Sequence, residues 1–540
     1  MPAVFDANCN REKPMEGERY DVLIIGSGHN GLVLGCYLAK AGLKVCVIER
    51  RLEAGGGLST EEITIPGFAH NLHSYFHDTV NIMPPYTDLK LEEHNARYYC
   101  PPVQAGMILP DGRSLCFYDS DNLDKTCESI ARFSSKDAKT WREIVANYGE
   151  FVSTVIVPAL YSPPAPPSEQ LIALEGSPEG MEWLRIGRMS PREVVDEWFE
   201  NEHVKALVLH HLPIPRGVLP DYAGLGAVIP LVISQVEKSQ MALGGSHITA
   251  HALWRVLLAS GGEIASLTHV QKILIEDGKA IGVESDNGRR FLAPVVVSTV
   301  DVKQTFLKMV GEDKLDPGFV SHVKGFRLDE FSVFAVHLAL REAPKFKTQP
   351  GYEDINQAFR LNIGFDTPDD YSEILADVRQ GRLPEKLAFI ASVPTWFDPS
   401  QAPSGHTAFL WALVPYRLKG ANWDDVRDEY ARRCIAKLQH YAPNVTADNI
   451  FAWETQTPVD IEARLVNMTE GGVFMGRMHM AQLEHFRPLP ELAQFRTPIK
   501  GLYMAGACMH PGGGIIAGPG LIAAEIIMDD LKLPKWWEGQ

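Results

Sequence analysis

Residues 20–49 read YDVLIIGSGHNGLVLGCYLAKAGLKVCVIE, and this stretch determines the class of the fold. The apolar runs at 20–25 and 44–49 are typical of short strands buried on both faces of a parallel sheet. Between them, Gly31, Gly35 and Ala39 recur every four residues, which indicates a helix packed closely on that sheet, and Gly42 ends the helix. The stretch therefore predicts a β-α-β unit, the first part of a dinucleotide-binding α/β fold.

The turn between the first strand and the helix has the pattern GxGxxG at residues 26–31. Glycines at these positions permit a tight turn and let a pyrophosphate approach the N-terminus of the helix. Glu49 closes the second strand eighteen residues after Gly31, where a carboxylate can accept both hydroxyls of an unphosphorylated ribose. The sequence therefore predicts a site for FAD or NAD. The alternative is that these glycines only pack the helix on the sheet.

The composition excludes several classes of protein. The 540 residues, 45% hydrophobic and 22% charged, match an ordinary globular chain with a sizeable core. The net charge of −17 opposes binding to nucleic acid and electrostatic anchoring to anionic lipid. The eight cysteines include no CxxC pair, so neither a disulfide scaffold nor a zinc site is indicated. With no signal or membrane-spanning segment visible, we expect a cytoplasmic protein, and leave peripheral membrane contact and homo-oligomer formation open.

A second glycine turn, RRLEAGGGLST at residues 50–60, follows Glu49. Together with GHNGLV at 28–33, ERR at 49–51, TEE at 60–62 and PGF at 66–68, it resembles the phytoene desaturase family of FAD-dependent oxidoreductases. The chain is most similar to the branch that contains the pyridine nucleotide-disulfide oxidoreductase domain proteins. The resemblance recurs near the C-terminus in Gln482, RP at 487–488, GLY at 501–503, Gly506 and HPGGG at 510–514.

The resemblance implies a noncovalent FAD extended across a Rossmann-like domain. It places the first glycine turn on the pyrophosphate, Glu49 on the ribose and the backbone of Val270 at the adenine. Gly506 and the loop through Ile515 would close over the pyrophosphate and flavin. The full set of cofactor-binding residues that we predict is Gly26, Ser27, Gly28, Asn30, Gly31, Glu49, Arg50, Arg51, Gly55, Gly56, Gly57, Leu58, Val270, Gly506, Gly514 and Ile515.

Two positions depart from the family pattern. The amine-oxidase-like superfamily follows its glycine pair with an arginine that faces the pyrophosphate, whereas this chain has Gly57, which leaves Arg51 as the nearer basic candidate. Carotenoid desaturases often end the C-terminal motif with Pro-Gly, whereas Ile516 and Ala517 stand here. The resemblance therefore does not imply a carotenoid substrate.

The fold class that we expect is α/β, with a Rossmann-like FAD-binding domain of the amine oxidase/phytoene desaturase type and an interleaved α+β substrate domain. Helical spacing from residue 244 to 261 precedes strand-like segments at 270–275, 280–283 and 291–299, which predict a small meander. Residues 501–506 predict another strand, followed by a helix at about 521–531. The stretches 91–239 and 316–454 are expected to be helical or irregular. The predicted division is a flexible tail at 1–18, an FAD-binding domain at 19–90, 240–315 and 455–540, and a substrate-binding domain at 91–239 and 316–454.

His70, His73 and His77 are spaced three and four residues apart, which on a helix would place them on one face. No acidic or cysteine partner stands at ligand spacing, so we expect no metal. The resemblance places this segment near the flavin, and His510 stands beside the cofactor loop. We take His73 and His510 as the candidate catalytic residues, with a hydrogen-bonding or capping role as the alternative for each.

These features predict an FAD-dependent dehydrogenase or desaturase. It would transfer a hydride from a hydrophobic, isoprenoid-like or cyclic substrate to flavin N5, and pass electrons to oxygen, a quinone or another acceptor. Oxidation of an amine or alcohol, isomerisation with reduced flavin, a nicotinamide dehydrogenase and a non-catalytic FAD-binding interaction protein are the alternatives. No GxSxG, HExxH or Walker motif supports hydrolysis or phosphoryl transfer. Trp536 and Trp537 are expected to dock on the body of the protein rather than on a partner or a membrane.

Overall fold

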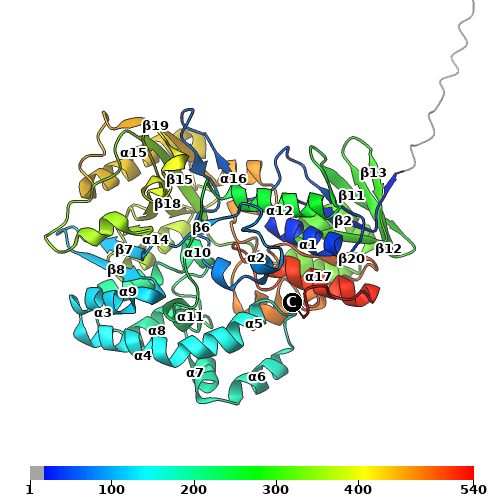
Figure 1. Cartoon of the computed structure of the whole chain (residues 1–540), viewed down its shortest axis with the longest axis horizontal. Helices are drawn as coiled ribbons and strands as arrows, with labels where there is room; N and C mark the ends of the chain where they lie inside the picture. The colour runs from blue at the N-terminus through cyan, green and yellow to red at the C-terminus, as the bar shows by residue number, and fades with distance from the viewer. Residues whose placement is uncertain (1–16, 540) are drawn as a thin grey trace, which may run out of the picture.

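The computed structural model describes residues 17–539 and contains two large sheet regions (Figure 1). In Figure 1 the sheet that contains β2 and β20 lies on the right, and the sheet that contains β15 and β18 lies on the left. Most of the expected flexible tail, residues 1–16, lies outside the described residues. Glu18, the last residue of that tail, instead begins strand β1 (Glu18–Arg19) and pairs with Phe291.

A five-stranded parallel sheet forms the first region, in the order β10 (Glu263–Ala265), β3 (Val45–Ile48), β2 (Val22–Ile25), β14 (Val295–Ser298) and β20 (Leu502–Met504). All residues of β2, β3, β14 and β20 are buried, as continuous apolar strands in such a sheet require. This sheet confirms the predicted β-α-β unit and the Rossmann-like α/β class.

Three helices accompany this sheet: α1 (His29–Lys40), α12 (His247–Ala259) and α17 (Gly518–Leu531). Helix α1 packs between α12 and α17 (Figure 1). A Cβ atom at Gly35 would lie 3.2 Å from the Val47 side chain and 3.3 Å from that of Leu257. The glycine spacing in α1 therefore serves close packing against both the sheet and α12.

The predicted meander is formed by β11 (Val270–Glu276), β12 (Lys279–Ser285) and β13 (Arg290–Leu292), which pair antiparallel. The prediction of one strand over 291–299 is wrong, because β13 stays in the meander while β14 joins the parallel sheet. Pro294 stands between them and has no backbone N–H for a strand ladder.

A seven-stranded mixed sheet forms the second region, although we expected helical or irregular structure in much of it. Its order is β19 (Ile450–Gln456), β15 (Ser332–Leu340), β18 (His406–Val414), β17 (Phe389–Ser392), β16 (Arg360–Ile363), β7 (Val103–Ile108) and β8 (Ser114–Tyr118). Only the pair of β16 and β7 is parallel within this sheet. All nine residues of β15 are buried, so its sequence lacks the apolar–polar alternation that marks a strand with one exposed face.

Helices cover the seven-stranded sheet. Helix α15 (Trp423–Tyr441) buries Tyr430 and Leu438 in one core cluster with Phe334 of β15. Helices α4 (Ser135–Phe151), α9 (Glu202–Leu209) and α14 (Pro368–Arg379) contribute to another core cluster, which also contains Phe117 of β8. The sheet and its helices come from residues 103–456, interrupted by the segments that build the parallel sheet and the meander. The exact domain boundaries stay a prediction.

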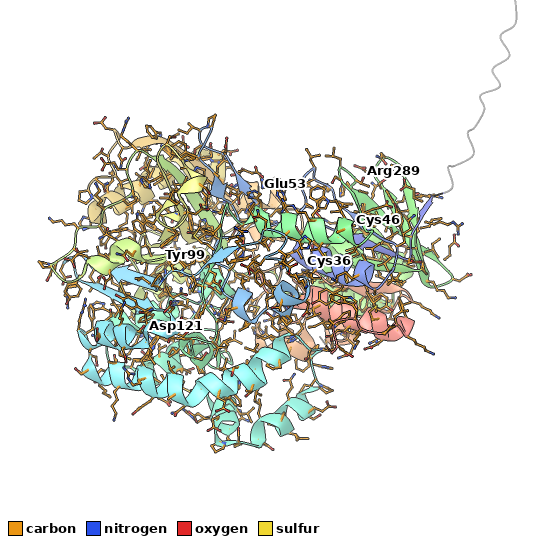
Figure 2. The ribbon with its side chains drawn as sticks, viewed as in Figure 1. Cys36, Cys46, Glu53, Tyr99, Asp121 and Arg289 are labelled. Carbon is orange, nitrogen blue, oxygen red and sulfur yellow. The ribbon has the colours of Figure 1, made fainter. Side chains whose placement is uncertain are left out.

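The described C-terminal segment packs on α1. The rings of Trp536 and Trp537 lie 5.2 Å and 4.8 Å from that of Tyr37, measured between centroids, and Trp536 Nε1 donates a hydrogen bond to the Tyr37 carbonyl oxygen. This confirms the prediction that these aromatics dock on the protein. No helix within residues 17–539 is long and apolar enough to cross a membrane. Cys36 and Cys46 (Figure 2) are free thiols buried in the core around the parallel sheet.

Candidate active site

A cavity of about 530 Å³ is lined by residues of the parallel-sheet region and of the seven-stranded sheet region. Most of the predicted site residues meet in its wall: Gly26, Gly28, Asn30, Gly31, Glu49, Arg50, Arg51, Gly56, Gly57, His73, Val270, Gly514 and Ile515. The wall does not include Ser27, Gly55, Leu58, Gly506 or His510. Residues more than four hundred positions apart in the sequence therefore converge on one site.

The first glycine turn has the shape that a pyrophosphate site needs. Gly26 has a φ of 95°, and a Cβ atom there would lie 2.6 Å from the Thr299 hydroxyl oxygen. A Cβ at Gly31 would lie 2.2 Å from the Gly26 carbonyl oxygen. By contrast, a Cβ at Gly28 would meet no protein atom within 4 Å, although Gly28 lines the cavity. Gly26 and Gly31 thus hold the turn together, and Gly28 leaves the backbone open to a ligand.

The N-terminus of α1 carries no side-chain cap and no acidic residue in its first turn. Its residues His29, Asn30 and Gly31 line the cavity. A helix N-terminus presents backbone N–H groups and a partial positive charge, which together favour an anion. The turn and the helix start therefore fit a diphosphate.

The second glycine turn supports the first. The Gly55 amide donates a hydrogen bond of 2.9 Å to the Ser27 carbonyl oxygen, and the Leu58 amide donates one of 3.0 Å to the Gly55 carbonyl oxygen. A Cβ at Gly56 would lie 3.0 Å from the Gly28 Cα atom. Gly55 and Leu58 therefore lie behind the wall and hold Gly56 against the first turn.

Glu49 is fixed at the end of β3 by three hydrogen bonds. Its Oε2 atom accepts from the backbone amide of Ser27 at 2.9 Å and from the Ser27 hydroxyl at 2.6 Å. Its Oε1 atom accepts from the backbone amide of Arg51 at 2.8 Å. The carboxylate therefore keeps one orientation in the cavity wall, and Ser27 positions it without lining the cavity.

Three arginines line the same end of the cavity. Arg51 and Arg464 both form ion pairs with Glu61, and Arg50 donates a hydrogen bond of 2.7 Å to the Arg464 carbonyl oxygen. Burial lowers the pKa of Arg464 to about 10, with Arg51 adding to the effect. Arg464, the last residue of α16 (Pro458–Arg464), was not predicted. The one signal was Gly57, which indicated that a basic residue had to come from elsewhere.

The C-terminal glycine loop closes another side of the cavity. A Cβ at Gly506 would lie 2.3 Å from the Thr299 carbonyl oxygen, so Gly506 permits the chain after β20 to lie against Thr299. Gly514 has a φ of 102°, and its Cβ would meet no protein atom within 4 Å. The Thr79 hydroxyl donates a hydrogen bond of 2.8 Å to the Ile515 carbonyl oxygen. The loop is thereby tied to the segment that follows His77.

The two candidate catalytic histidines lie in different surroundings. His73 lines the cavity, and its Nε2 atom has no hydrogen-bond partner within the described part of the chain. Burial, with a smaller effect of Arg51, lowers the pKa of His73 to about 3, so the ring is neutral at pH 7. His510 lies behind the wall with Nε2 2.9 Å from the Ala159 carbonyl oxygen, and burial lowers its pKa to about 4. Both catalytic assignments stay predictions.

The neighbouring histidines do not share a helix face with His73. His70 belongs to strand β5 (His70–Asn71), and its Nε2 atom lies 2.8 Å from the Thr64 hydroxyl. The two ring nitrogens of His77 lie 2.9 Å from the hydroxyls of Ser74 and Tyr98. Over residues 17–539, no group of three or more His, Cys, Asp or Glu side chains is arranged to hold a metal ion.

The remainder of the cavity wall is mainly aromatic and aliphatic. Phe76 packs edge-to-face on Tyr75 and Trp411, at ring-centroid distances of 5.0 Å and 5.8 Å. Aliphatic side chains complete this surface: Ile214, Val218, Val228, Leu231, Val333, Ala335, Ile461 and Leu465. These residues could not be predicted from the sequence, because they come from segments spread between residues 75 and 465.

The chain is similar in sequence to known proteins. A family model described as an NAD(P)-binding Rossmann-like domain matches residues 24–89. The chain is 32% identical to a limonene dehydrogenase subunit from Castellaniella defragrans, over 97% of each chain. It is 29% identical to pyridine nucleotide-disulfide oxidoreductase domain-containing protein 2 from Rattus norvegicus, covering 95% of this chain and 94% of the relative. It is 24% identical to the neurosporene-forming phytoene desaturase of Rhodobacter capsulatus, over 94% of each chain.

Solved structures have the same fold. An oxidoreductase from Methanosarcina mazei superposes with a TM-score of 0.60 at 16% identity, covering 94% of this chain and all of that one. Cyclohexylamine oxidase from Brevibacterium oxydans superposes with a TM-score of 0.57 at 16% identity, covering 95% of this chain and 99% of that one. These similarities confirm the predicted fold type.

Proposed function

The chain belongs to the phytoene desaturase family of FAD-dependent oxidoreductases, and we propose from this premise that it binds FAD and dehydrogenates a hydrophobic, isoprenoid-like or cyclic substrate. The observation that carries the proposal is one continuous cavity in which the dinucleotide-binding turn meets an aromatic and aliphatic surface. A nucleotide and an apolar molecule can lie against each other in such a cavity.

The residues around the two glycine turns and the C-terminal glycine loop have the chemistry that FAD requires. The open backbone at Gly28 and the uncapped start of α1 would receive the pyrophosphate, and the oriented Glu49 carboxylate would accept the ribose hydroxyls. Val270 and the loop through Gly514 and Ile515 would flank the adenine and the flavin respectively. The chemistry that bound FAD supplies is acceptance of a hydride equivalent, with onward transfer of electrons to oxygen, a quinone or another acceptor.

The arginines at this end supply positive charge. Arg51 and Arg464 share the single carboxylate of Glu61, so this group of three carries a net positive charge toward the cavity. The amine-oxidase-like superfamily has an arginine at the position that Gly57 occupies in this chain. We propose that the charge of Arg51 and Arg464 takes the place of that arginine. The pair would hold the diphosphate by charge-assisted hydrogen bonds.

The aromatic and aliphatic part of the cavity wall would bind and orient the substrate. Tyr75, Phe76 and Trp411 offer ring faces and edges, and the aliphatic side chains beside them exclude water. His73 has a buried Nε2 atom without a partner among the described residues, which makes it the candidate to form a hydrogen bond with a bound molecule. Its pKa of about 3 makes it a weak proton acceptor, so a role as base would require a bound ligand to raise that pKa. His510, held by the Ala159 carbonyl, would position the glycine loop.

The proposal is tested by comparing wild-type protein with Trp411→Ala and with Trp453→Ala. Trp453 lies outside the cavity wall and serves as the matched control. Flavin reduction under anaerobic conditions would be followed with limonene, a cyclic alcohol and a cyclic amine. We expect limonene or the cyclic alcohol to reduce the flavin of the wild type and of the Trp453 variant. The same compound should reduce the flavin of the Trp411 variant at least about tenfold more slowly, because an aromatic contact is lost. Reduction by the amine alone would favour an amine oxidase and contradict the proposal.

A further inference from the structure

Four charged side chains form a cluster beside the apolar part of the cavity. This charge cluster consists of Asp78, Arg216, Glu237 and Arg360. Arg360 Nη2 lies 2.9 Å from Asp78 Oδ1, Arg216 Nη1 lies 3.8 Å from Asp78 Oδ2, and Arg216 forms a further ion pair with Glu237. The exposed fraction of the side chain is 13% for Asp78, 16% for Arg216, 9% for Glu237 and 1% for Arg360. The cluster is therefore largely shielded from solvent.

The cluster is built from separate segments. Arg216 ends helix α10 (Pro213–Arg216), Arg360 begins β16, and Glu237 lies in the loop before β9 (Met241–Ala242). Asp78 immediately precedes Thr79, whose hydroxyl bonds the Ile515 carbonyl oxygen. The cluster therefore lies one residue from the contact that ties the glycine loop in place.

Three of its members, Asp78, Arg216 and Glu237, line the large cavity. All four also line a second cavity of about 60 Å³. Lys238, which pairs with Asp121 (Figure 2) at 3.3 Å, lines this smaller cavity as well. The cluster thus stands between the apolar surface and a polar recess.

A purely apolar ligand would not match this wall. Charged groups lose their interaction with water when a ligand covers them, and they recover that loss only through new hydrogen bonds. The Nε atom of Arg360 already has no hydrogen-bond partner among residues 17–539. A hydrocarbon placed against Arg216 and Glu237 would remove water from them and return no hydrogen bond.

The charges of the cluster determine which polar group fits. Two guanidinium groups and two carboxylates sum to zero net charge, so neither an anion nor a cation is strongly favoured. A hydroxyl can donate to a carboxylate and accept from a guanidinium at the same time. An ether, ketone or ester oxygen can only accept, so it would leave the carboxylate without a donor.

We propose that the substrate is an apolar, isoprenoid-like or cyclic molecule with one hydroxyl group, and that Arg216 and Glu237 bind this hydroxyl. The inference rests on the proposed function and narrows its substrate class from hydrophobic, isoprenoid-like or cyclic molecules in general to those that carry a hydroxyl group. Tyr75, Phe76 and Trp411 would contact the skeleton, and the cluster would select for the hydroxyl.

Calorimetric titration of the purified flavin-containing protein tests the inference. The ligands are limonene and two alcohols of the same carbon skeleton, carveol with a ring hydroxyl and α-terpineol with a side-chain hydroxyl. We expect at least one alcohol to bind about tenfold or more tightly than limonene, because a site with buried hydrogen-bonding groups rejects an analogue that lacks the partner group. Equal affinities for all three ligands would overturn the inference.

The double variant Arg216→Met with Glu237→Leu removes one cation and one anion and leaves Asp78 paired with Arg360. We expect it to lose the preference for alcohol and to bind limonene at least as tightly as the wild type. An unchanged preference would overturn the inference. Glu237→Gln keeps the size of the side chain and one acceptor oxygen, and we therefore expect it to retain part of the preference.

The matched control is Arg185→Met with Glu182→Leu, an exposed ion pair on helix α7 (Pro178–Ile186). We expect it to retain the full preference of the wild type, and loss of the preference in this control as well would overturn the inference. The calorimetric readout does not depend on turnover. If the wild type binds alcohols more tightly than limonene but no ligand reduces its flavin, the hydroxyl site is supported and the proposed dehydrogenation is contradicted. If a ligand reduces the flavin but all three ligands bind equally, the dehydrogenation is supported and the hydroxyl site is contradicted.

Discussion

Replacement of Gly28 by alanine separates cofactor binding from folding. Gly28 has φ −60° and ψ 165°, a conformation that alanine adopts without strain, and its Cβ would meet no protein atom within 4 Å. The protein without cofactor should therefore be as stable as the wild type or more stable, by about 0.4 to 1 kcal/mol, because alanine restricts the unfolded chain. The added methyl group would, however, occupy the space through which a pyrophosphate approaches the backbone.

We expect Gly28→Ala to weaken FAD binding at least about tenfold, which corresponds to about 1.4 kcal/mol. Gly31→Ala should act differently, because its Cβ would lie 2.2 Å from the Gly26 carbonyl oxygen. Accommodating it should cost about 1 to 3 kcal/mol of folding stability. Gly149→Ala, on α4 with no atom within 4 Å of its Cβ, is the control that should bind FAD normally.

The assay is titration of flavin-free protein with FAD, followed by quenching of flavin fluorescence, together with the thermal midpoint of each flavin-free variant. We predict that Gly28→Ala has normal stability with weak FAD binding, and that Gly31→Ala has reduced stability. Wild-type FAD affinity in Gly28→Ala would refute the placement of the pyrophosphate, as would a loss of affinity in Gly149→Ala.

Three further changes have defined outcomes. Glu49→Ala removes the predicted ribose acceptor and the partner of Ser27, so FAD affinity should fall about tenfold to a hundredfold in the same titration, and an unchanged affinity would exclude Glu49 from the ribose site. The pKa of His73 is about 3 in the folded protein, whereas its ordinary value is 6.5. Between these values only the unfolded chain binds the proton, so protonation favours unfolding. The free energy of unfolding should therefore fall by up to about 2 kcal/mol as the pH drops from 7 to 5. The thermal midpoint of His73→Gln should consequently fall less over this range than that of the wild type, and an equal fall would show that His73 is not buried as a neutral ring. Trp537→Ala removes the edge-to-face contact with Tyr37 and should lower the free energy of unfolding by about 1 to 2 kcal/mol, seen as a lower thermal midpoint with unchanged FAD binding.

The parts of the site that could be predicted from the sequence are local in the chain. The β-α-β unit follows from apolar runs and glycine spacing within residues 20–49, because strand burial and close helix packing impose those patterns directly. Glu49 could be placed because its distance from Gly31 is set by the length of one helix and one strand.

The remaining parts depend on contacts between distant segments. Arg464 reaches Glu61 from four hundred residues away, and the charge cluster combines Asp78 with Arg360. No local pattern encodes such pairs. Strand β15 was missed for a different reason, because a fully buried strand has the same continuous apolar sequence as a buried helix segment.

The central claim is that this cavity holds FAD and that a hydrophobic substrate reduces it. The most direct test is the visible absorbance spectrum of the purified protein, recorded before and after anaerobic addition of limonene, carveol or α-terpineol. We predict the spectrum of an oxidised flavin, bleached by at least one of these compounds. A protein that carries no flavin and binds none when FAD is supplied, or a bound flavin that none of these compounds reduces, would contradict the account.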